Sequence, residues 1–211
     1  MVAAEPAGKH LFLRFDSGLE LHTHLGMRGS WHLYRPGERW RLPEAAAAVV
    51  LEFHTAVAVC FRASIAEVER GRSSVRHLGP DVVAPDFDAG AAAARARALE
   101  VPTVGEALLD QRAAAGIGNV FRCELLWMLR VSPFRGLDAC DDALLAELFS
   151  SAARLVAANA AVSAPRRFPH GRAAVHGRAG RPCPRCGTPV ATRRLGEQAR
   201  VAYWCPGCQP G

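Results

Sequence analysis

Four of the seven cysteines in this chain have a spacing that suits a metal ion. They form two C-x-x-C pairs, Cys183 with Cys186 and Cys205 with Cys208, and 18 residues separate the pairs. Such an arrangement typically brings four thiolates around one tetrahedral zinc ion. Because sulfur would fill all four positions, the spacing predicts a structural Zn2+ and not a catalytic one. Two disulfides or a redox C-x-x-C motif remain as alternatives.

Lys9 is the only lysine in the chain, and the other 25 of the 26 basic residues are arginine. A guanidinium group stays protonated and cannot form an imine. Any imine chemistry in this sequence must therefore use Lys9 or the terminal amine of Met1, which makes Lys9 a candidate catalytic residue. A GC-rich genome accounts for the bulk of the arginine bias without reference to function.

Positive charge concentrates near the C-terminal end. The formal net charge is +6, but residues 165–211 contain nine arginines against a single acid, Glu197, so this segment alone carries +8. A clustered arginine excess is typical of proteins that bind a polyanion such as nucleic acid. The sequence shows neither a stretch of about 18 apolar residues nor a basic region followed by an apolar block, so we expect a cytoplasmic protein without a membrane partner.

A glycine-rich segment, Ala115-Gly116-Ile117-Gly118-Asn119, lies between two regions that are expected to be helical. Its glycines predict a tight turn between a helix that ends near Arg112 and one that begins near Val120. Backbone N–H groups at the start of a helix can hold a phosphate. Taken alone, the segment is equally consistent with a plain connector between helices.

The elements that must position these groups divide the chain into regions of different character. Alternating apolar residues between 10 and 34, with apolar runs at 49–53 and 56–61, predict a hairpin and further strands of one sheet. Helix formers dominate after residue 90, where the capping-box spacing from Thr103 to Glu106 predicts a helix start. An apolar stripe predicts another helix over 141–160. Residues 165–172 interrupt the periodicity and are interpreted as a linker.

The chain resembles the formamidopyrimidine-DNA glycosylase and endonuclease VIII family in three separated blocks. These are Gly8-Lys9-His10-Leu11 with His24-Leu25-Gly26-Met27-Arg28-Gly29, Leu109-Asp110-Gln111 through Gly116-Ile117-Gly118-Asn119-Val120-Phe121, and Gly177-Arg178 running into the four cysteines; Leu78-Gly79-Pro80-Asp81 is a weaker match. The resemblance implies an α+β multidomain fold. Its parts are a truncated N-terminal β-sandwich lobe at 1–88, a helix-two-turns-helix DNA-binding domain at 89–164, and a linker with a C-terminal β-hairpin zinc finger at 165–211.

The second and third blocks imply contacts with double-stranded DNA that is abasic or carries an oxidised base flipped out of the helix. Asn119, directly after Gly118, is the turn residue expected to contact a phosphate. Arg200 stands where the finger arginine of the family reaches the phosphates beside the lesion, and Arg178 belongs to the third block. His176, before this block, replaces the more usual tyrosine.

The first block implies an active-site role for Lys9, whose counterpart in the family approaches the phosphate on the lesion side. Met27 matches the loop residue that fills the void left by the extruded base, and Arg28 follows it in the same loop. The alternatives are a surface lysine and an ordinary core methionine. Glycines on both sides of Met27 favour an exposed loop.

The activity implied is base-excision repair by a DNA glycosylase with abasic-site lyase activity. In this family an N-terminal proline amine forms an imine with the sugar, and an adjacent glutamate handles protons. The sequence has no such Pro-Glu at the corresponding distance before Lys9, and Pro6 is an internal amide without a nucleophilic nitrogen.

We favour an upstream start in a longer enzyme over the alternative of a zinc-dependent DNA-binding remnant without catalysis. A zinc-ribbon protein-interaction domain is a third possibility, but it does not explain the glycine-rich turn. We expect a monomer associated with the nucleoid.

Overall fold

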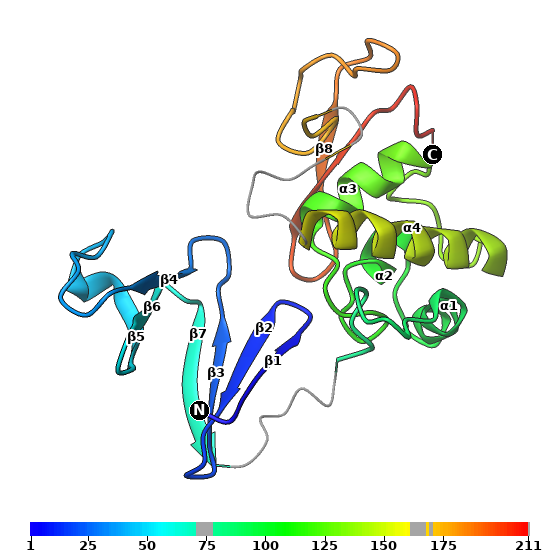
Figure 1. Ribbon diagram of the computed structural model, residues 1–211. Coiled ribbons are helices and arrows are strands. Elements are labelled where there is room, and N and C mark those ends of the chain that lie inside the picture. Colours follow the sequence, from blue (N-terminus) through cyan, green and yellow to red (C-terminus); the bar gives the residue numbers. More distant parts are fainter. Residues whose placement is uncertain (71–77, 161–167, 169–170, 211) are drawn as a thin grey trace. The chain divides into compact units, whose positions relative to one another are not determined.

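The computed structural model describes residues 1–70, 78–160, 168 and 171–210, and the chain divides into two compact units, residues 1–75 and 76–211. The N-terminal unit consists mainly of strands, whereas the C-terminal unit is mainly helical with a β-hairpin (Figure 1). This change in character follows the change in the sequence pattern before residue 89.

The described part of the N-terminal unit contains two antiparallel sheets. Its elements are β1 (Ala3–Ala7), β2 (His10–Arg14), β3 (Leu19–His24), β4 (Ser30–Tyr34), a 3-10 turn (Glu44–Ala46), β5 (Ala47–Glu52), β6 (Val57–Phe61) and β7 (Ile65–Arg70). The strand orders are β1-β2-β3-β7 and β4-β6-β5. The predicted hairpin is confirmed as β2 and β3, but the prediction of a single sheet is wrong.

The loop after β3 explains why the chain leaves the first sheet. The Gly29 N–H donates to the Leu25 carbonyl over 2.8 Å, which closes a turn. Gly26 has a φ of +62°, a left-handed conformation that favours glycine. Because this turn redirects the backbone, β4 pairs with β6 instead of extending the sheet of β3.

The edge strand β1 and the strand β7 were not predicted from the sequence. Pro6 lies within β1, where a missing N–H is tolerated because one side of an edge strand has no ladder partner. Strand β7 pairs with β3 along its whole length although its side chains are largely exposed. Its lack of clear apolar alternation explains why the pattern did not reveal it.

The C-terminal unit holds four helices within its described residues. They are α1 (Ala89–Arg97), α2 (Val104–Ala107), α3 (Asn119–Met128) and α4 (Asp142–Ala160), and Figure 1 shows α3 and α4 beside each other. The Asp88 carboxylate caps α1 by accepting from the Ala91 N–H. The Thr103 hydroxyl caps α2 as the sequence predicted.

Helix α4 confirms the predicted apolar stripe. Leu145, Leu148, Phe149, Ala152 and Leu155 are buried in one cluster that also includes residues of α1 and α3. In length and apolar composition α4 could also cross a membrane. A helix that covers a globular core with one apolar face has a similar composition, and the buried stripe of α4 packs against residues of α1 and α3 in this way.

Helix α2 is shorter than predicted, because it ends at Ala107 and not near Arg112. The backbone turns instead, and the Asp110 carboxylate accepts from the Arg112 N–H over 2.9 Å. Such a local side-chain acceptor competes with the helical hydrogen-bonding pattern. Most of the predicted linker at 165–172 lies outside the described residues. A hairpin of β8 (Ala191–Leu195) and β9 (Arg200–Trp204) completes the unit.

Candidate nucleic-acid interface and metal centre

The four predicted cysteine ligands converge on one point. The Cys186 sulfur lies 3.4 Å from those of Cys205 and Cys208, and the Cys183 and Cys208 sulfurs are 3.9 Å apart. A tetrahedron with Zn–S bonds of about 2.3 Å has edges of about 3.8 Å, whereas a disulfide needs about 2.0 Å. All four ligand atoms lie within 4.8 Å of one another, and all seven cysteines are free thiols. The geometry fits one tetrahedral metal ion, so the cluster is a candidate metal centre.

The metal centre rests on the C-terminal part of α3. The indole N–H of Trp127 donates to the Cys183 sulfur over 3.3 Å, and the Arg185 guanidinium stacks 4.0 Å from the centre of the same ring. Arg185 also donates to the Trp127 carbonyl over 2.9 Å. At the Cys186 thiol, hydrogen bonds with the side chain and backbone of Thr188 lower the pKa to about 6, which favours the thiolate that binds metal.

A buried carboxylate on α3 holds the segment that leads into the finger. Glu124 accepts from the backbone N–H groups of Ala174, Val175 and His176 over 2.6, 3.0 and 2.8 Å. Glu124 is only 2% exposed, and the three N–H donors replace the water that its carboxylate loses on burial. Glu124 was not predicted from the sequence, because one glutamate within an apolar helix gives no signal of its distant partners.

The same segment places Arg178, which follows the His176 to Gly177 turn. The His176 ring lies 4.9 Å from the Tyr203 ring on β9, so the histidine at this position packs against the hairpin. Arg178 is partly buried, and its guanidinium donates to the Pro182 carbonyl over 3.0 Å. This contact fixes Arg178 beside the first C-x-x-C pair.

The glycine-rich turn is organised by Gln111. Its side-chain carbonyl accepts from the Gly116 N–H over 3.0 Å, and its amide donates to the Leu109 and Ile117 carbonyls over 2.9 and 3.1 Å. Gly116 has a φ of +107°, which side chains rarely adopt. Helix α3 then begins at Asn119, and its cap residue Gly118 supplies no side-chain acceptor. The first N–H groups of α3 are therefore not capped by a side chain, which suits an anion.

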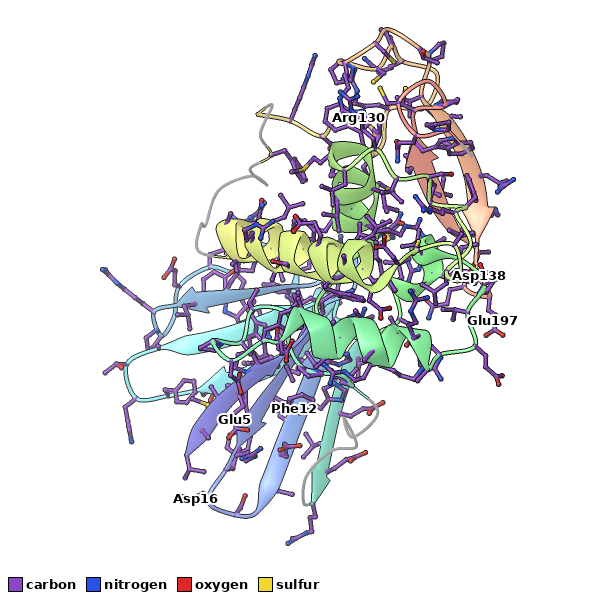
Figure 2. All side chains as sticks on the ribbon, turned by 90° about the vertical axis from the view of Figure 1, so that its right-hand side faces the viewer. Glu5, Phe12, Asp16, Arg130, Asp138 and Glu197 are labelled. Carbon is purple, nitrogen blue, oxygen red and sulfur yellow. The ribbon has the colours of Figure 1, made fainter. Side chains whose placement is uncertain are left out.

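The structure brings the turn and the finger hairpin together. The Asn119 side-chain amide donates to the Val201 carbonyl on β9 over 2.9 Å, so Asn119 lies next to the residue that follows Arg200. The Arg200 side chain is exposed and contacts the Gln198 side chain over 3.4 Å. Figure 2 labels Glu197 at the tip of this hairpin. Two residues far apart in the sequence thus lie on neighbouring parts of one surface.

The site residues predicted in the N-terminal unit lie on loops at strand ends. Lys9 is exposed between β1 and β2, and Arg28 is exposed in the loop after β3. Met27 is 94% exposed, which excludes the core-methionine alternative. Burial first, and then the charges of Lys9 and His22, lower the pKa of His24. Histidines also cluster here, because His10 Nδ1 and His22 Nε2 are 2.7 Å apart.

Comparisons with known proteins agree with this architecture. The family profile described as "Formamidopyrimidine-DNA glycosylase H2TH domain" matches residues 78–163. The chain is 41% identical to "Probable endonuclease 8 2" of Streptomyces coelicolor, over 98% of this chain and 78% of that protein. It is 36% identical to "DNA-(apurinic or apyrimidinic site) lyase Nei2" of Mycolicibacterium smegmatis, over 96% of this chain and 79% of that protein.

Among solved structures, the MutM (Fpg) protein from Thermus thermophilus aligns with a TM-score of 0.72 and 26% identity, over 98% of this chain and 81% of that one. Lactococcus lactis Fpg in complex with DNA that contains an abasic site aligns with a TM-score of 0.78 at 20% identity, a likeness of fold. The chain therefore belongs to the formamidopyrimidine-DNA glycosylase and endonuclease VIII family, and the fold predicted from the sequence is confirmed.

Proposed function

We propose that this protein acts in base-excision repair as a DNA glycosylase with abasic-site lyase activity, on duplex DNA that is abasic or carries an oxidised base. The observation that carries the proposal is the hydrogen bond from Asn119 to Val201, which joins the start of α3 to the strand of Arg200. An uncapped helix start beside an exposed arginine suits two neighbouring phosphates of one strand. The relatives named as an endonuclease and an abasic-site lyase support the same substrate class.

The metal in the proposed protein is one Zn2+ held by Cys183, Cys186, Cys205 and Cys208. Four thiolates leave no open coordination position, so the ion stabilises the finger and takes no part in the reaction. Few large apolar side chains are buried around the cysteines, and metal binding therefore supplies much of the folding free energy of this segment.

Three residues of the N-terminal unit also have roles in the proposed activity. Met27 and Arg28 enter the DNA at the lesion, where an exposed apolar side chain can replace an extruded base. Lys9 is the candidate amine of this sequence. Attack of its nitrogen on the sugar aldehyde of an abasic site forms an imine with loss of water. Loss of a C2′ proton then breaks the C3′–O bond and releases the 3′ phosphate, and hydrolysis of the imine frees the lysine. We further propose a monomer in the cytoplasm, at the nucleoid.

The test combines DNA binding with trapping of the imine. We expect the purified chain to bind a duplex with one abasic site at least tenfold more tightly than the intact duplex. Asn119→Ala and Arg200→Ala should each weaken binding about tenfold, the cost of one lost phosphate contact. Arg154→Ala, on the exposed side of α4, is the matched control that removes a charge elsewhere.

Borohydride reduction then tests the chemistry. An adduct that maps to Lys9 and disappears in Lys9→Arg supports this lysine as the amine. An adduct at the terminal amine moves the role of nucleophile to that group. Tight binding to abasic DNA without any adduct refutes imine chemistry by residues 1–211 and leaves a DNA-binding protein. Equal affinity for abasic and intact duplex refutes the substrate class.

A further inference from the structure

Arg122 is the only arginine among the described residues that is fully buried, with 0% of its surface exposed. Its guanidinium donates to the Gly105 carbonyl over 3.4 Å and to the Val201 carbonyl over 3.3 Å. Its Nε has no hydrogen-bond partner among the residues that the structure describes. Within the described parts of the chain, no carboxylate forms an ion pair with it.

A buried cation with this set of partners is incompletely compensated. Two long hydrogen bonds to carbonyls replace only part of the hydration that a guanidinium loses on burial. Burial is accordingly the largest influence on the pKa of Arg122 and lowers it, although an arginine remains protonated. The nearby Glu106 carboxylate accepts from the Thr103 hydroxyl over 2.6 Å and forms no ion pair with Arg122.

The position of Arg122 shows where a counter-charge can come from. It lies one turn into α3, behind the helix start at Asn119, and the first turn of this helix contains no acidic residue. Asn119 and Arg122 both donate to the same Val201 carbonyl. The charge of Arg200 also acts on Arg122, so positive charge and uncapped N–H groups gather at one corner of the unit.

We propose that Arg122 is a positioning residue for DNA, a buried cation whose counter-charge is the phosphate held at the start of α3. It acts through the protein in two ways. The electrostatic field of the Arg122 guanidinium adds to that of the N-terminus of α3 and acts on the phosphate through protein of low dielectric constant, where screening by salt is weak. Its hydrogen bonds tie β9 and Gly105 of α2 to α3, which fixes the spacing between Asn119 and Arg200. This inference rests on the proposed DNA-binding function.

The test uses Arg122→Met and Arg122→Lys in the full chain loaded with zinc. Met retains most of the length of the arginine side chain but carries no charge. Lys retains the charge but lacks the guanidinium group that donates to two carbonyls. We expect Arg122→Met to weaken binding to abasic duplex roughly tenfold at every salt concentration, with an unchanged slope of log affinity against log salt. Arg200→Ala, which removes a direct phosphate contact, should instead reduce that slope by about one. Arg122→Lys should retain affinity within about threefold.

Thermal unfolding separates this role from a purely structural one. Since the free protein carries Arg122 without a full counter-charge, Arg122→Met should unfold at the same temperature as the parent or higher. Inorganic phosphate should raise the unfolding temperatures of the parent and of Arg154→Met. The increase should be smaller for Arg122→Met. If Arg122→Met and Arg122→Lys lose stability and DNA affinity in parallel, or if Arg122→Met retains full affinity, the inference is overturned. Failure of the parent to prefer abasic DNA would instead refute the proposed function.

Discussion

Replacement of Glu124 by glutamine should release the segment that connects the helices to the finger. The carboxylate receives three backbone N–H groups, from Ala174, Val175 and His176. The side-chain carbonyl of glutamine can retain the two donors that now share one oxygen. Its NH2 group, however, would face the Ala174 N–H, so two donors would meet where a 2.6 Å hydrogen bond now lies.

The magnitude follows from these contacts. Hydrogen bonds to a charged group contribute about 1.5–3 kcal/mol each, and an unsatisfied buried donor costs a further ~1 kcal/mol or more. We therefore expect Glu124→Gln to cost about 3 kcal/mol, a large part of the stability of an ordinary domain. Glu124→Ala, which removes every acceptor, should cost more.

Hydrogen exchange measured by mass spectrometry gives a local readout for this prediction. A loss of about 3 kcal/mol corresponds to exchange roughly 100-fold faster at the amides of residues 174–176. Glu147→Gln on α4 is a matched control, since its carboxylate contacts only the Ser151 and Arg154 side chains among the described residues. Unchanged exchange at residues 174–176 in the Glu124 variant would show that these three hydrogen bonds do not hold the segment.

Three further predictions concern the metal centre, a helix end and an ion pair. Cys186→Ser should lower the metal content and the unfolding temperature, as measured by atomic absorption and calorimetry, and a chelator should have the same effect on the parent. Arg130→Gly should stabilise the chain by about 1 kcal/mol in thermal unfolding, because Arg130 follows the end of α3 with a φ of +57° that glycine adopts without strain. The hydrogen bonds from Arg112 lower the pKa of Asp110. This pair therefore stabilises the fold fully above the unfolded pKa of aspartate. The stabilisation is lost as the pH falls through the lowered pKa of Asp110 in the folded state. Asp110→Asn should accordingly be less stable than the parent at neutral pH, and in denaturation measured across pH the difference should vanish once the pH falls below the lowered, folded pKa of Asp110.

The ends of the helices and the contacts between distant segments could not be predicted from the sequence alone, because they depend on the tertiary structure. The spacing of the four cysteines was sufficient to predict that they cluster as a candidate metal centre, because two C-x-x-C pairs at this separation can bring four sulfurs around one ion. The apolar stripe of α4 could likewise be predicted from the sequence, since its period of 3.6 residues follows from helix geometry alone. In contrast, α2 ends well before the predicted end, because the Asp110 side chain takes the Arg112 N–H and Gln111 organises the glycine turn.

The sequence by itself determined two local features of the C-terminal unit: a glycine turn before a helix and a four-cysteine cluster. Only the tertiary structure placed Asn119 against Val201 and buried Arg122 and Glu124 beneath the finger. A motif is local, so residue types and spacing reveal it. Which carbonyl accepts from a buried arginine depends on segments up to 79 residues apart, and that choice is made by packing.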